Sequence, residues 1–371
     1  MIKNIIHISG NKSIWIIVLF LSLFSLAAVY SAEGLDNVIK HFLKLFSGIL
    51  VLYFVHKIPA EYYSGIGRIM FFGSAVCLFI LLLPLGSFIP EINGARRWIP
   101  LPFGLTFQPS DIAKIGTIMF LSRNIIKHKS RLVSFKDFFK YLFLPLLIIV
   151  FFILPHDFST SFMLLLLGFI LFFFGGVKFS HLFKSVLYVL FFFSILYFGI
   201  KQVPDFANVF PRGETWVLRI DNFINNDISN KKSNFQAIEA RKAMSNGGWK
   251  GVGPGKSLHR STLTEAGSDY IYAIIIEEYG LTGGAIVLIL YLWFLFIGNK
   301  IYFNLKNHYR GLIVLGLTFS IVLQALVNIS VAIGLFPVTG QNLPLISTGG
   351  TSIIVTCVNF GFIIGITKNI K

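Results

Sequence analysis

The chain has 371 residues, of which 55% are hydrophobic and only 13% are charged. A soluble domain of this size carries roughly twice that charged fraction, so the composition excludes an ordinary soluble fold. The apolar stretches are continuous rather than alternating, which argues against a transmembrane β-barrel. We therefore expect an all-α polytopic membrane protein with a single transmembrane domain over residues 1–371.

The net charge of +16 does not indicate a nucleic-acid partner, because most of the basic residues lie in short segments between apolar stretches. Lys and Arg residues in such segments set the orientation of membrane helices. We expect the remaining basic residues to bind an anionic substrate or anionic lipid headgroups. Cys77 and Cys357 both fall within apolar stretches, so we interpret them as packing residues rather than a disulfide or a metal pair.

The hydropathy pattern predicts ten membrane-spanning helices. We expect them at residues 14–31, 38–56, 66–86, 110–126, 140–155, 158–176, 180–200, 269–297, 310–335 and 350–367. With the N-terminus in the cytoplasm, the inner segments hold 17 of the 32 basic residues. This asymmetry predicts that both termini are cytoplasmic (N-in, C-in) and that one large extracytoplasmic loop, about 201–268, joins spans 7 and 8.

A polar segment between the third and fourth predicted helices, residues 93–114, contains the basic pair Arg96 and Arg97. Its three prolines prevent a continuous helix. A basic pair on the outer side of the membrane runs against the positive-inside trend. This placement favours ligand binding over an interfacial anchor for the pair.

The fourth predicted helix is preceded by Gln108 and opens with Ser110 and Asp111. We expect Ser110 to cap the helix and Asp111 to complement the helix dipole. Lys114 follows Asp111 by three residues and therefore lies on the same helical face. Lys114 either snorkels to the membrane surface or serves a functional site together with Asp111.

The long outer loop is expected to form two short interfacial helices, near 219–223 and 234–244. A Gly-rich segment, 247–257, follows and ends in Gly-Lys-Ser. It is not a Walker motif, because Lys250 stands where that motif requires glycine. The segment either presents backbone N–H groups and Lys256 to a phosphate or is a flexible linker.

The eighth predicted helix opens with Ser268 and Asp269 and carries Glu277 and Glu278 within its apolar part. Carboxylates are costly there, so each is a candidate functional residue. The alternative role for Asp269 is to cap the N-terminus of this helix, for which Ser268 is an equally good candidate. Glu277 lies near the helical face of Asp269, whereas Glu278 points nearly opposite.

The segment before the last predicted helix, 334–352, is kept non-helical by its prolines and glycines. Irregular backbone at membrane depth is tolerated only where protein or a watery cavity surrounds it, so we expect a re-entrant segment that lines a site. Ser347 and Thr348 are its candidate hydrogen-bond donors. An acid, several cations and a Gly-rich loop thus gather on the outer side, which suits a reaction on an anionic, membrane-bound substrate.

Four motifs resemble those of the SEDS family (shape, elongation, division and sporulation), typified by FtsW and RodA. They are residues 94–99, residues 108–114, the run from 247 through 269–281, and residues 334–340 with 343–350. The resemblance covers nearly the whole chain. Asp111 departs from it, because the family usually has Glu at this position.

The resemblance implies a peptidoglycan glycosyltransferase that polymerises lipid II on the outer face of the bacterial cytoplasmic (inner) membrane. It implies that Asp269 is the general base or the ligand of a divalent cation, Mg²⁺ or Mn²⁺, and that Arg96, Arg97 and Lys114 bind the pyrophosphate. The further candidate substrate-binding residues are Asp111, Gln108, Lys256, Glu277 and Ser347.

The resemblance also implies partners, namely a class B penicillin-binding transpeptidase and other division proteins. The form of the Gly-rich segment is closer to FtsW, the division branch, than to the RodA elongation branch. A lipid II flippase and a non-catalytic scaffold are the competing functions. A flippase predicts ionisable residues at mid-depth on several spans, whereas those found here cluster on the outer side.

Overall fold

The computed structural model describes residues 10–83, 89, 91, 96–100, 106–202, 212–225 and 231–368, without the side chains of 225 and 231–234. The predictions made for 84–86, 93–95, 101–105, 203–211 and 226–230 lie outside these ranges. Within them the chain is almost entirely helical, and the strands β1 (Ile99–Pro100) and β2 (Thr106–Phe107) pair antiparallel.

Helices lie at the positions of all ten predicted spans. The first part of the chain forms α1 (Lys12–Glu33), α2 (Leu35–Val55), the 3-10 turn η1 (Ala60–Tyr62), α3 (Tyr63–Leu82), α4 (Pro109–Lys127), α5 (Phe135–Phe138), the π-helical η3 (Phe139–Phe143), α6 (Leu144–Ile153), α7 (Phe158–Phe174) and α8 (Phe179–Gln202). The second part forms α10 (Gly213–Asn225), α11 (Lys231–Gly247), the 3-10 turn η4 (His259–Ser261), α12 (Ile271–Asn304), α13 (His308–Ala332) and α14 (Ser352–Thr367). Helices α10 and α11 confirm that the predicted long loop is helical in the two expected places.

Six of the described helices are long and apolar enough to cross a membrane. They are α1, α2, α3 together with η1, α8, α12 and α13. Helices α7 and α14 are apolar but shorter. The chain therefore has the composition and helix lengths of a multi-pass membrane protein.

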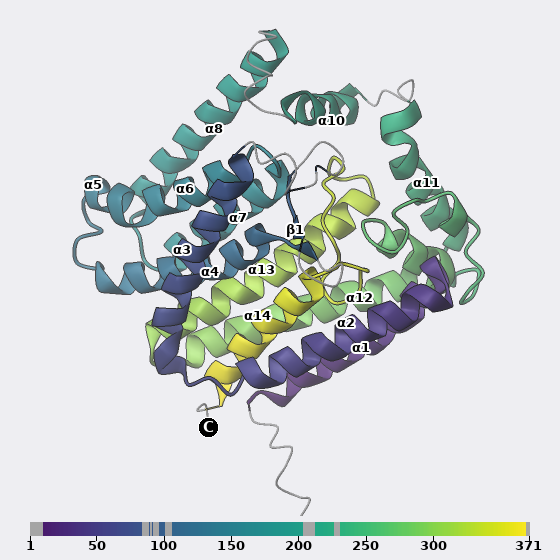
Figure 1. Ribbon diagram of the computed structural model, residues 1–371, viewed down its shortest axis with the longest axis horizontal. Helices are drawn as coiled ribbons and strands as arrows, with labels where there is room; N and C mark the ends of the chain where they lie inside the picture. The colour runs from purple at the N-terminus through teal and green to yellow at the C-terminus, as the bar shows by residue number, and fades with distance from the viewer. Residues whose placement is uncertain are drawn as a thin grey trace, which may run out of the picture.

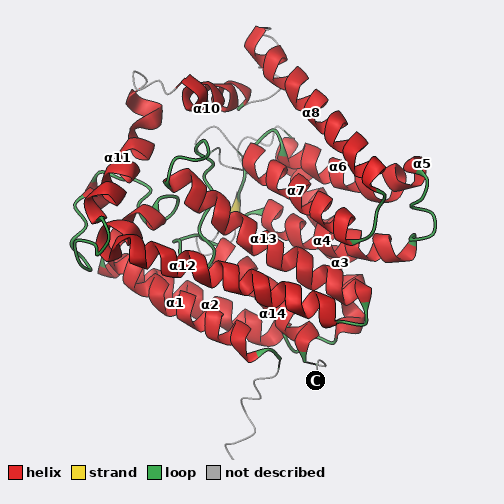
Figure 2. Ribbon diagram, turned by 180° about the vertical axis from the view of Figure 1, so that it is seen from behind, coloured by secondary structure: helices red, strands yellow, loops and turns green. Residues whose placement is uncertain are grey.

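Helix α13 lies at the centre of the bundle and is the most buried of these six helices. It packs against α4, α7, α12 and α14 (Figure 1). Helices α1 and α2 pack side by side against α12 and α14, respectively. Seen from behind, α8 leans away from the bundle, and α10 and α11 lie at one end of it (Figure 2).

Helix α12 is broken at Gly280, whose φ of 71° lies in the left-handed region. Two carbonyls before the break accept hydrogen bonds from the Gly-rich segment. The N–H of Val252 donates to the carbonyl of Glu277 at 2.9 Å, and that of Gly253 donates to the carbonyl of Glu278 at 3.0 Å. The segment thus supplies the backbone bonds that the break removes from the helix.

The Gly-rich segment is therefore an anchored turn, and the flexible-linker alternative is wrong. Because the N–H groups of Val252 and Gly253 are used on α12, they are not free for a phosphate. Lys256, at the far side of the turn, is exposed. The positive φ of Gly251 (79°) lets the turn approach α12 closely, since a Cβ there would lie 2.1 Å from the Glu278 carbonyl oxygen.

This contact predicts that Gly251→Ala destabilises the protein by about 3 kcal/mol, from the left-handed backbone and the overlap together. Gly255→Ala is the matched control, because its φ is 75° but no atom lies within 4 Å of its Cβ position. The control is expected to lose only about 1 kcal/mol. Thermal unfolding in detergent measures both, and equal losses would show that the close approach to α12 is unimportant.

Candidate active site

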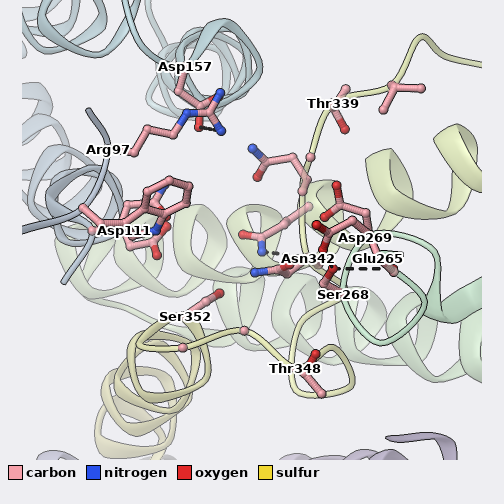
Figure 3. A pocket seen from close by; sticks show the side chains of 18 of the residues that line it. Arg97, Asp111, Asp157, Glu265, Ser268, Asp269, Thr339, Asn342, Thr348 and Ser352 are labelled. Carbon is pink, nitrogen blue, oxygen red and sulfur yellow. Dashed lines mark hydrogen bonds and ion pairs between the residues drawn. The ribbon is translucent and has the colours of Figure 1, made fainter. Parts of the chain in front are cut away.

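A cavity of about 620 Å³ opens where the ends of α4, α7, α10, α12 and α13 meet the segment 338–352 (Figure 3). This volume is in the range of small-molecule and cofactor sites. Polar and charged side chains dominate its lining, among them Arg97, Gln108, Asp111, Asp157, Arg212, Arg219, Glu265, Ser268, Asp269, Gln341 and Asn342. The segment that was predicted to be re-entrant is non-helical and lines this cavity.

The backbone around Asp269 is fixed by groups from two other elements. The Asn328 amide on α13 donates to the Asp269 carbonyl at 2.9 Å. The Ser347 hydroxyl donates to the Ser268 carbonyl at 2.6 Å. Ser347 thus holds the turn that carries Asp269 in position, and it does not line the cavity.

The helix-capping alternative for Asp269 and Ser268 is wrong. Helix α12 begins at Ile271, and its N-cap is Tyr270, which makes no side-chain capping bond. The Ser268 hydroxyl instead donates to Glu265 Oε2 at 2.5 Å. The Asp269 carboxylate is therefore not occupied by the helix end and faces the cavity (Figure 3).

The surroundings of Asp269 favour its protonated form. Burial raises the pKa of Asp269 to about 6, and the neighbouring Glu265 carboxylate adds to the rise. The guanidinium groups of Arg219 and Arg97 oppose it. A carboxylate with a pKa near neutrality is suited to accept a proton from a substrate hydroxyl.

Arg97 is held on the other side of the cavity, at the start of α7 (Figure 3). Its Nε donates to the His156 carbonyl at 2.8 Å, and its Nη1 lies 3.3 Å from Asp157 Oδ2. Asp157 is buried and caps α7 by accepting from the Thr160 N–H. The ion pair orients Arg97 and leaves the remaining guanidinium N–H groups for a ligand.

Arg219 on α10 and Arg212, directly before that helix, add two further guanidinium groups, which sequence reasoning missed. Arg219 Nη1 donates to the Val338 carbonyl at 2.9 Å. Burial, together with repulsion from Arg97 and Arg219, lowers the pKa of Arg212 to about 10. The pKa of Arg219 is lowered for the same reasons, burial first and Arg97 second. Three crowded cations form a site that a polyanion would stabilise.

Asp111 and Lys114 form a buried ion pair at 3.0 Å, as their spacing predicted. Lys114 Nζ also donates to Gln324 Oε1 at 3.1 Å, and Gln324 Nε2 donates to the Asn342 carbonyl at 3.0 Å. Asp111 lines the cavity, whereas Lys114 lies behind it. Lys114 therefore neutralises Asp111 and does not snorkel to the surface.

The start of α4 differs from the expectation in one detail. Its N-cap is Gln108, without a side-chain capping bond, so the prediction that Ser110 caps the helix is wrong. Pro109 takes the first helical position, where its missing N–H costs nothing. The Gln108 side chain donates to Ser110 Oγ at 3.0 Å and lines the cavity.

Besides Ser347 and Lys114, three further candidate substrate-binding residues lie outside the cavity. Arg96 turns back to the Leu83 carbonyl, and Lys256 is exposed on the Gly-rich turn. Glu277 is fully buried and holds that turn by accepting from Ser257 and from other groups of the segment 246–259. Glu277 therefore has a structural role, and its shared helical face with Asp269 does not bring it to the cavity.

The missed residues left weak signals in the sequence. Asp157 is a carboxylate between two apolar spans, which marks either a cap or a functional group. Arg219 belongs to the amphipathic helix α10 and Arg212 directly precedes it, and only tertiary structure brings this segment over the cavity. Glu265 lies in a polar turn with no helical period that relates it to Asp269.

A family model for FtsW, RodA and SpoVE, described as a cell cycle protein, matches residues 10–371. The chain belongs to this family. A probable peptidoglycan glycosyltransferase FtsW from Borreliella burgdorferi is 33% identical over 303 residues, 80% of this chain and 78% of that protein. One from Hydrogenovibrio crunogenus is 29% identical over 323 residues, 85% of this chain and 78% of that protein.

Two solved structures share the FtsW/RodA/SpoVE fold with this chain. One, from work on structural coordination of polymerization and crosslinking by a peptidoglycan synthase complex, has a TM-score of 0.80 and 20% identity, and the match covers 98% of this chain and 99% of that one. The other is a mutant of the rod shape determining protein RodA of Thermus thermophilus. It has a TM-score of 0.72 and 20% identity, with the same coverage.

The raised pKa of Asp269 predicts a gain in stability when its charge is removed. The folded protein binds more protons than the unfolded chain between the ordinary value of 3.8 and about 6, so stability falls as the pH rises through this window. Above it, Asp269→Asn is expected to be more stable than the wild type by about 1–2 kcal/mol, after screening by solvent.

Thermal unfolding in detergent at pH 8 and pH 4 measures this gain, which is expected to shrink at the lower pH. Asp221→Asn is the control, because hydrogen bonds from Tyr197 and Lys201 lower the pKa of Asp221. Removal of that charge is expected to give no gain. An Asp269→Asn variant that is less stable than the wild type at pH 8 would contradict the assignment of a desolvated carboxylate.

Proposed function

We propose that this protein is a peptidoglycan glycosyltransferase that polymerises lipid II for septal cell-wall synthesis. The observation that carries the proposal is the arrangement of the cavity. A carboxylate with a pKa near 6 faces it from one wall, and three guanidinium groups, those of Arg97, Arg212 and Arg219, lie on other walls. The relatives named as FtsW glycosyltransferases support the same activity.

The cavity residues fit both the proton transfer from the acceptor and the departure of the leaving group. Asp269 accepts the proton of the acceptor sugar's 4-hydroxyl while the oxygen of that hydroxyl attacks the anomeric carbon of the donor. The bond from that carbon to the pyrophosphate oxygen breaks, and undecaprenyl pyrophosphate leaves with the bonding electrons. Arg97, Arg212 and Arg219 stabilise the charge that develops on the leaving group. Lys114 and Asp111 hold α4 and the segment 338–352 in position.

A divalent cation fits this site only together with substrate. The described part of the chain contains no group of three or more potential metal ligands. Mg²⁺ commonly takes one or two protein carboxylates and completes its shell with water and phosphate oxygens. Asp269 and Glu265 would hold such an ion, which would neutralise charge on the pyrophosphate.

The proposal includes the orientation of the chain in the bacterial cytoplasmic membrane. Ten spans with both termini inside put the cavity, α10 and α11 on the extracytoplasmic side, where lipid II is polymerised. The proposed partner is a class B penicillin-binding transpeptidase, together with other division proteins. The peptidoglycan synthase complex that shares the fold supports a partner of this kind.

Two alternatives are less well supported. A lipid II flippase needs a polar path through the bilayer, but the buried carboxylates Glu277 and Glu278 are bound by the Gly-rich turn and the Ser31 hydroxyl. An elongation polymerase of the RodA type fits the cavity equally well. The division role rests on the FtsW-named relatives.

Glycan-strand formation from purified lipid II, with and without the transpeptidase, tests the polymerase assignment. Asp269→Ala is expected to lose a factor of about 10²–10⁴ in rate, the usual contribution of a general base. Asp221→Asn, which removes an acid outside the cavity, is expected to retain activity. A folded Asp269→Ala variant with full activity would refute the role of Asp269. Lipid II translocation in vesicles without strand formation would favour the flippase.

A further inference from the structure

A second cavity, of about 360 Å³, lies where the start of α1 meets the ends of α12 and α14. In Figure 1 the start of α1 and the end of α14, which border this cavity, lie on the opposite side of the bundle from α10. Its lining combines the aromatic side chains of Trp293 and Phe296 with Lys300, Asn304, Asn11 and Lys368. The proposed glycosyltransferase reaction uses none of these residues.

The floor of this cavity is fixed by tertiary contacts. The Asn11 N–H donates to Thr367 Oγ1 at 2.9 Å and so joins the start of α1 to the end of α14. Gly10, with a φ of 99°, packs so closely that a Cβ there would lie 2.7 Å from Ile364 Cγ2. The start of α1 and the end of α14 therefore meet in a defined arrangement rather than by loose proximity.

The cavity has an excess of positive charge. In the described part of the chain, neither Lys300 nor Lys368 forms an ion pair with a carboxylate. Burial and the nearby Lys57 lower the pKa of Lys368. The C-terminal dipoles of α12 and α14 and the N-terminal dipole of α1 together contribute roughly −0.5, so about +1.5 of the two full lysine charges remains. An anion at this position would relieve that excess.

The α12 wall of the cavity changes from apolar to polar along one helical face. Trp293, Phe296, Lys300 and Asn304 follow at three- to four-residue spacing, over about 16 Å of helix axis. Trp293 and Phe296 are 42% and 65% exposed on the surface of the bundle. A wall of this kind matches an amphiphile with an anionic head and apolar tails, and it does not match a small free anion.

We propose that this cavity binds an anionic phospholipid. Lys300 and Lys368 hold the headgroup phosphate, with Asn304 as a further donor, and Trp293 and Phe296 contact the acyl chains. Basic cavities between membrane helices commonly bind such headgroups. The proposal requires only that this end of the bundle lies at a membrane surface, and it does not depend on the glycosyltransferase activity.

Native mass spectrometry of the full-length protein in neutral detergent, titrated with phosphatidylglycerol or phosphatidylcholine, tests the proposal. The wild type is expected to bind phosphatidylglycerol preferentially. Each lysine is expected to contribute about fivefold, so Lys300→Gln/Lys368→Gln should bind roughly 25-fold more weakly. The matched control, Lys129→Gln/Lys306→Gln, removes two exposed lysines that do not line the cavity and should bind as the wild type does.

Equal binding of the two lipids, or an equal loss in the control variant, would overturn the proposal. Lys300→Arg/Lys368→Arg keeps both charges and is expected to retain binding, so its failure would also contradict the assignment. Competition with millimolar inorganic phosphate distinguishes a lipid headgroup from a free phosphate ion as the ligand. Full displacement of the lipid by inorganic phosphate would identify a free-anion site instead.

Discussion

Two amide side chains on α13 connect the parts of the candidate active site. Asn328 donates to the carbonyls of both Asp269 and Gln341, at 2.9 and 2.7 Å. One turn earlier, Gln324 links Lys114 to the segment 338–352. Because these residues are four positions apart, they lie on the same face of the central helix. The acid, the buried ion pair and the re-entrant segment are thereby fixed to one rigid element.

This arrangement supplies hydrogen-bond partners for backbone groups that the apolar helices around them do not satisfy. Irregular backbone inside a membrane protein must find hydrogen-bond partners within the protein. The segment 338–352 receives them from α13, and the break at Gly280 in α12 receives them from the Gly-rich turn. The polar groups that complete the backbone therefore also hold Asp269 in position. Preorganised groups of this kind need no rearrangement during a reaction.

The sequence alone predicted the helices well, because continuous apolar runs of this length have few alternatives. It also identified Asp269, Arg97 and Asp111, which line the cavity, since each stands out as a polar residue at the edge of a span, whereas Gln108 was a candidate only through the family resemblance. These signals are local. They depend on the cost of polar groups near a membrane and not on knowledge of the tertiary structure.

Two of the three errors have a common physical origin. Helical spacing placed Glu277 near Asp269, but spacing does not reveal that the Gly-rich turn packs over Glu277. Arg212 and Arg219 were missed because their contribution depends on where α10 lies relative to α7 and α13. Ser110 was assigned as a cap from residue preference, whereas Gln108 and Pro109 shift the helix start. Long-range packing, which a single sequence does not encode in a local pattern, decided the first two cases, whereas the helix start was decided locally by Pro109.

The dependence of strand formation on pH tests the central claim most directly, namely that the Asp269 carboxylate accepts the proton. The account predicts that the rate rises with pH up to an inflection at about 6 and then levels off. In Arg219→Gln the inflection should move to higher pH, because the guanidinium of Arg219 lowers the pKa of Asp269 in the wild type. An inflection at the ordinary value of 3.8, or one that Arg219→Gln leaves unmoved, would contradict the account.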